Sequence, residues 1–152
     1  QDIINDFYSV RLEIYRDRKA YLIKEINHKI KVASNKAKYI MGILDDTIDL
    51  RKKKNEEIIN ILKEYGLDMI DDSYNYLIKM TMDSVSDENV EKLKNDLQEL
   101  NAILNKLEAT SEEKMWLEEL EKLEDEYNKH INKLKSTNSE KILIKKKLKQ
   151  NK

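Results

Sequence analysis

Apolar residues recur at helical spacing along the first third of the chain, in alternating steps of three and four that place them on one stripe of a helix. The chain has no proline, so nothing interrupts this pattern before position 50. Asp2 can cap the start. We therefore predict an outgoing helix over residues 1–50, roughly 70 Å long at about 1.5 Å per residue. The stripe comprises Ile3, Phe7, Val10, Ile14, Leu22, Ile26, Ile30, Ala33, Ala37, Ile40, Leu44 and Ile48.

A helix of this length needs an equally long partner, and the second half of the chain supplies one over residues 86–135. Ser86 can cap a leucine-striped helix, and Ser111, followed by two glutamates, predicts a break near 110 and a fresh helix after it. An antiparallel hairpin of the two arms would bring Phe7 and Val10 to residues 123–134, and Leu44 to Val90 and Leu93.

Residues 51–85 lie between the arms and are too apolar for a linker, so we predict a small globular tip. A short helix over 55–65 would end at Gly66, a glycine suited to a helix C-terminus. The apolar residues that follow could form a self-contained core or could face a second subunit. The predicted fold is thus all-α: a long antiparallel coiled-coil hairpin whose small helical tip mediates dimerisation.

Charge and composition argue against a compact enzyme, because 39% of the residues are charged whereas about 25% is usual. No cysteine is present, which excludes disulfides and thiolate metal sites and favours an intracellular protein. His28 and His130 are far apart in the sequence, and the adjacent pairs Asp45–Asp46 and Asp71–Asp72 suit capping or solvation. We therefore expect no catalytic residue, no cofactor-binding residue and no metal ligand.

The net charge of −1 gives no bulk attraction to nucleic acid or membranes. No apolar run approaches the roughly 20 residues that cross a bilayer, so no membrane partner is expected. Residues 136–152 are rich in lysine and are expected to form a basic, flexible tail. Such a tail could contact phosphates or act as a nuclear targeting signal, or it could be a solvated linker.

Three blocks, in order, resemble the C-terminal coiled coil of eukaryotic-type DNA topoisomerase II. Residues 7–19 read FYSVRLEIYRDRK and are similar to the family's entry into that coil. YLIKM at 76–80, followed by SVSDENV at 84–90, resembles its Tyr-Leu-Leu-x-Met segment and the start of its return helix. WLEEL at 116–120 resembles the Trp and Asp-Leu near the base of the coil. The tip is shorter than in cellular versions, and Ile78 and Met82 replace commoner residues, which fits a viral or highly diverged source.

The resemblance implies a mechanical, non-catalytic role in closing the exit gate, or C-gate, through which a transported DNA duplex leaves during ATP-dependent strand passage. The implied partners are a second copy of the chain, the remainder of the topoisomerase and, transiently, duplex DNA. ATP and Mg²⁺ would be used by the parent enzyme outside this segment. The implied location is the nucleus for a cellular protein, or the host cytoplasm or replication site for a viral one.

Within the predicted tip, two groups of residues are candidates for contacts. The candidates for the dimer interface, chosen because they are apolar, are Ile58, Ile61, Leu62, Met69, Tyr74 and Met80. The candidates for contact with the passing duplex are Arg51, Lys52, Lys53 and Lys54, although the sequence favours a solvated run near the tip over DNA contact.

Two other classes of function remain open from the sequence. A structural coiled coil that tethers or spaces partners, with no role in DNA topology, would not need the tip for association. A helix that binds nucleic acid or a membrane surface through its lysine tail would bind bare duplex in a strongly salt-dependent way.

Overall fold

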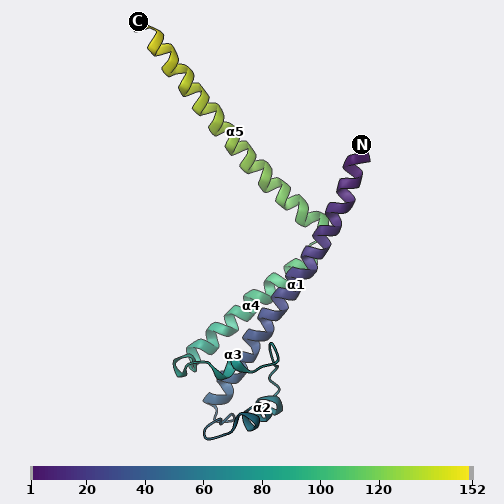
Figure 1. Cartoon of the computed structure of the whole chain (residues 1–152), viewed down its shortest axis with the longest axis vertical. Helices are drawn as coiled ribbons and strands as arrows, with labels where there is room; N and C mark the ends of the chain where they lie inside the picture. The colour runs from purple at the N-terminus through teal and green to yellow at the C-terminus, as the bar shows by residue number, and fades with distance from the viewer. Residues whose placement is uncertain (1, 151–152) are drawn as a thin grey trace. The chain divides into compact units, whose positions relative to one another are not determined.

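The computed structural model describes the backbone of residues 2–150 and their side chains, except those of Met82 and residues 136–150. Its elements are α1 (Asp2–Leu44), α2 (Asn55–Glu64), α3 (Asn75–Ile78), the 3₁₀-helix η1 (Met82–Ser84), α4 (Asp87–Ala109) and α5 (Glu112–Gln150) (Figure 1). Within these residues the only β-type pairing is an isolated bridge between Ile70 and Ser73, and the predicted all-α class is confirmed. The expected flexible tail, 136–152, lies where the side chains or the whole residues fall outside this description, so it stays a prediction.

The chain divides into two compact units, and α1 contributes to both. The tip unit is Arg18–Ala109, and the terminal unit combines Gln1–Asp17 with Thr110–Lys152. Each has its own packing and is described by itself.

In the tip unit, α1 ends at Leu44 rather than near the expected Leu50. Asp46 adopts a left-handed conformation with φ of 55°, and the Ile48 N–H donates to the Gly42 carbonyl at 2.8 Å. The chain thereby folds back over the helix end, where a Cβ at position 42 would lie 2.6 Å from Ile48 Cδ1. Glycine at position 42 therefore permits this close return, which periodicity alone does not reveal.

The segment after this turn folds against the end of α1 around one small apolar core. Its fully buried members are Tyr39, Ile48, Leu62, Leu67, Tyr74 and Leu77, with Ile43, Leu50, Ile58, Ile61, Tyr76 and Met80 half-buried against them. α2 ends at Glu64, and Gly66 follows with φ of 76°, the left-handed conformation common after a helix. The core therefore fixes the tip to α1.

α4 then returns beside the tip unit's part of α1 (Figure 1), and the Lys19 ammonium donates to the Glu108 carbonyl at 3.3 Å. The end of α4 thus meets the start of this part of α1, an antiparallel arrangement. Ala33, Ala37, Ile40 and Val90 are buried in this unit. Small alanines on α1 let a neighbouring helix approach closely.

The second segment of the terminal unit begins where the helix is interrupted: α4 ends at Ala109 and α5 begins at Glu112. The Ser111 hydroxyl accepts a hydrogen bond from the Lys114 N–H at 3.2 Å, as an N-cap residue does. Serine therefore caps the new helix where the sequence pattern places its start.

Candidate interaction surface

The six predicted interface residues have different positions in the tip. Leu62 is 0% exposed and Tyr74 is 4% exposed, so both belong to this chain's own core and offer a partner almost no surface. Ile58, Ile61 and Met80 are half-buried against that core. Met69 is 43% exposed. The prediction of interface residues is thus corrected for Leu62 and Tyr74. A small tip needs its few apolar residues for its own core, so apolar character alone does not identify an interface.

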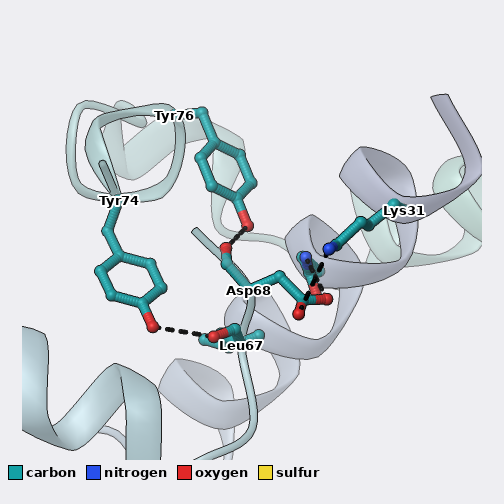
Figure 2. A network of polar contacts seen from close by, with 6 residues as sticks. Lys31, Leu67, Asp68, Tyr74 and Tyr76 are labelled. Carbon is teal, nitrogen blue, oxygen red and sulfur yellow. Dashed lines mark hydrogen bonds and ion pairs between the residues drawn. The ribbon is translucent and has the colours of Figure 1, made fainter. Parts of the chain in front are cut away.

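Asp68 connects the loop after α2 to α1 by two polar contacts and to α3 by a third (Figure 2). Its carboxylate oxygens lie 3.4 Å from the Lys31 ammonium and 3.4 Å from Nδ2 of Asn35, which is itself buried. The Tyr76 hydroxyl donates to the Asp68 carbonyl at 2.6 Å. Nearby, the Tyr74 hydroxyl donates to the Leu67 carbonyl at 2.8 Å, so the start of the loop is bonded to the residue before α3. These polar contacts help to hold the short tip, which has no disulfides, in one conformation.

The four predicted DNA-contact residues are exposed, and two of them have structural contacts. The Arg51 guanidinium donates to the Asp49 carboxylate at 2.9 Å and 3.3 Å, which lowers the pKa of Asp49 and raises that of Arg51. The Lys54 N–H donates to Glu57 Oε2 at 3.1 Å at the start of α2. Lys52 occupies a left-handed conformation with φ of 59°. The run forms a turn whose cationic side chains face solvent.

A groove opens beside these charged residues in the tip. It has a volume of about 530 Å³. The lining residues are Tyr39, Ile43, Asp46, Ile48, Asp49, Leu50, Arg51, Ile58, Ile78, Met80 and Val85. The sequence prediction included Ile58 and Met80 but missed Ile43, Ile78 and Val85, which come from three separate segments. The only sequence signal for them is an excess of apolar residues in a short segment.

In the terminal unit, Trp116 of α5 packs on three aromatic rings of α1. Its ring centroid lies 5.6 Å from Tyr8 and 5.9 Å from Tyr15, both stacked, and 6.2 Å from Phe7, edge to face. The Tyr15 hydroxyl donates to Glu119 Oε2 at 2.5 Å, and the Arg11 guanidinium lies 5.3 Å from the Tyr15 ring centre. We call these residues the aromatic clamp: Phe7, Tyr8, Tyr15 and Trp116.

The clamp corrects the expected pairing of Phe7 and Val10 with residues 123–134. Phe7 contacts Trp116 instead, while Val10 is 58% exposed and Leu123 is 63% exposed. Stacking of aromatic rings favours the contact of Phe7 with Trp116 over the pairing with residues 123–134 that a uniform apolar stripe predicts.

Neither metal binding nor membrane crossing has support in the described residues. No group of three or more His, Cys, Asp or Glu side chains among them is arranged to hold a metal ion. Likewise, no helix in the described part combines the length and apolar character needed to span a membrane.

The described residues thus form an all-α segment whose tip unit carries an apolar groove. The family model for the A-type subunit of DNA gyrase/topoisomerase IV matches residues 1–121, and the chain belongs to this family. The resemblance to type II topoisomerases drawn from the three sequence blocks is thus confirmed at the level of the family.

Individual relatives agree with this assignment. DNA topoisomerase 2 of Plasmodium falciparum is 28% identical over 158 residues, which cover 82% of this chain and 11% of that protein. DNA topoisomerase 2 of Acanthamoeba polyphaga mimivirus is 31% identical over 130 residues, which cover 79% and 10%. The crystal structure of the P. falciparum topoisomerase II DNA-binding, cleavage and re-ligation domain is similar with a TM-score of 0.72 and 27% identity, over 86% of this chain and 22% of that one. This chain therefore spans about a tenth of the length of the curated relatives it matches.

Proposed function

We propose that this chain is the coiled-coil and exit-gate dimerisation segment of a type II DNA topoisomerase and has no catalytic group of its own. In this proposal α1 is the outgoing arm of a hairpin, and α4 and α5 form the return arm. The tip associates with the tip of a second copy, and a transported duplex leaves when the two tips separate. DNA cleavage and the use of ATP and Mg²⁺ belong to other parts of the parent chain. The parent acts in the nucleus if it is cellular, and in the host cytoplasm or at a replication site if it is viral.

The observation that carries this proposal is a tip with its own core that still leaves apolar surface exposed. Leu62 and Leu77 are 0% exposed, yet Ile78 is 40% exposed. A gate needs a folded end that can meet its copy without unfolding. It must also separate in each cycle, which suits a modest symmetric patch near the roughly 1,200–2,000 Å² of standard interfaces, not a large permanent one.

Transient contact with the departing duplex is assigned to the basic run at the start of the tip. Lys52 and Lys53 are exposed cations there, whereas Arg51 is engaged with Asp49. Such phosphate contacts are weak and sensitive to salt, as passage of any duplex sequence requires.

The mass of the fragment Arg18–Ala109 in solution tests the proposal. We expect sedimentation equilibrium to show a reversible dimer of the fragment, as of the whole chain, because the tip lies within it. A fragment that stays monomeric while the whole chain dimerises contradicts the proposal.

That contrary outcome would favour the tether or spacer function, which a specific observation also supports. Several apolar residues of the terminal unit are exposed: Ile3 (84%), Phe7 (60%), Val10 (58%), Leu120 (45%), Leu123 (63%) and Tyr127 (61%). A chain that associates through these stripes would need residues 1–17 and 110–152 and would not need the tip.

A further inference from the structure

The tip groove is mostly apolar and is formed where four segments converge. Its walls come from Tyr39 and Ile43 of α1, the 46–51 segment, Ile58 of α2 and the 78–85 segment. Its charged side chains are Asp46, Asp49 and Arg51, and the last two bind each other at 2.9 Å. A polar small molecule would find few free groups to fix its orientation, whereas an apolar side chain of a protein would fit this lining.

Ile78 is both a wall of this groove and a projecting residue. α3 ends at Ile78, and the Leu77 N–H donates to the Tyr74 carbonyl at 2.9 Å. This single helical turn fixes the backbone of both Leu77 and Ile78. Leu77 is 0% exposed and points into the core, while its neighbour Ile78 is 40% exposed. The same surface thus offers a cavity and an apolar side chain beside it.

The charges around the groove are compatible with a copy of the same surface. The Asp49–Arg51 ion pair neutralises two of the three charged lining residues. The remaining lining charge is Asp46, and Lys53 lies close enough to Asp49 to help lower the pKa of that carboxyl. Both signs of charge are therefore present at the groove, so an identical patch related by a two-fold axis can match them.

We propose that Ile78 of each chain inserts into the groove of a second copy, so that the two Ile78 side chains meet near the two-fold axis of the dimer. This inference rests on the proposed function and specifies the surface that performs it. Ile58 and Met80 are walls that receive the partner's Ile78, and Met69 lies outside the contact.

Disulfide cross-linking tests the geometry directly, because the chain contains no cysteine. Ile78→Cys should give a covalent dimer under mild oxidation, since the two Cα atoms must come within about 7 Å for a disulfide to form. Ile59→Cys is a matched control: Ile59 is 38% exposed on the same tip and does not line the groove. Cross-linking at 59 but not at 78 would overturn the inference.

A charge substitution gives an independent measurement on the whole chain. Ile78→Asp should raise the dimer dissociation constant by about 10-fold or more, because an unpaired carboxylate would enter an apolar groove. Ile59→Asp should change it less than about 3-fold, and circular dichroism should show equal helix content in both variants.

The outcomes separate this inference from the proposed function. If the chain dimerises but Ile78→Asp behaves as the native chain does, the groove is not the contact, while dimerisation through the tip stands. If the native chain is monomeric at every concentration, both proposals fail.

Discussion

Four of the eight tyrosines are stabilised by the fold in their neutral form. The hydrogen bond to Glu119, followed by burial, raises the pKa of Tyr15. Burial also raises the pKa of Tyr39, Tyr74 and Tyr76, although a hydrogen bond with Asn35 partly opposes this at Tyr76. The stability of both units therefore depends on pH in the alkaline range.

The free energy of unfolding should therefore fall as the pH rises above about 10, where tyrosine ionises in the unfolded chain. Below that pH the tyrosine hydroxyls are protonated in both the folded and the unfolded chain, and their full contribution to stability is present. Urea titrations from about pH 8 to pH 11 measure the effect. Tyr74→Phe removes one of the four groups and should give a shallower decline, so an unchanged decline in this variant would contradict the explanation.

At the scale of elements, turns depend on residues that tolerate a left-handed backbone. Asp71 and Asp72 have φ of 50° and 54° and join Ile70 to Ser73, whose N–H and C=O groups pair in both directions at 3.1 Å. This is a two-residue turn of the kind in which glycine is preferred at the second position. Aspartate is tolerated there at some cost.

Asp72→Gly should stabilise the tip unit by about 0.5–1 kcal/mol, because it relieves the left-handed conformation. Asp72→Ala should destabilise it by a similar amount, about 1 kcal/mol, since alanine has neither glycine's conformational freedom nor aspartate's tolerance of the left-handed region. Thermal unfolding of both variants compares them. Equal effects of Gly and Ala would show that backbone strain at this turn is not decisive.

For the whole molecule, the two units differ in how much apolar surface they bury. Among the described residues, the buried apolar side chains are Ala33, Ala37, Tyr39, Ile40, Ile48, Leu62, Leu67, Tyr74, Leu77 and Val90 in the tip unit, and Tyr15 in the terminal unit. Stability follows local burial, so the units need not unfold together.

Trp116, the single tryptophan, reports on the terminal unit alone. In urea, its fluorescence should change at a lower concentration than the far-ultraviolet circular dichroism, to which both units contribute. Tyr15→Ala removes a stacking partner and should lower the fluorescence midpoint further while leaving the later transition unchanged. Coincident transitions in the native chain would instead show one cooperative unit.

The sequence determines α1, α2, α4 and α5 and several of their ends, because these depend on local chemistry. Apolar spacing specifies α1 and α4, Ser111 provides the cap before α5, and Gly66 supplies the positive φ after α2. These signals lie within a few residues of the structure they specify, so they can be read without knowing the rest of the fold. The family resemblance is likewise carried by short ordered blocks.

Only the tertiary structure decides which apolar residues of the tip face inward and which remain at the surface. Leu62 and Tyr74 enter the core whereas Ile78 stays exposed, although hydrophobicity alone makes all three candidates for either place. Trp116 stacks on Tyr8 and Tyr15, and this register differs from the one that a uniform stripe predicts. Both outcomes depend on contacts between residues distant in sequence, where packing and stacking select one arrangement among several that the same pattern allows.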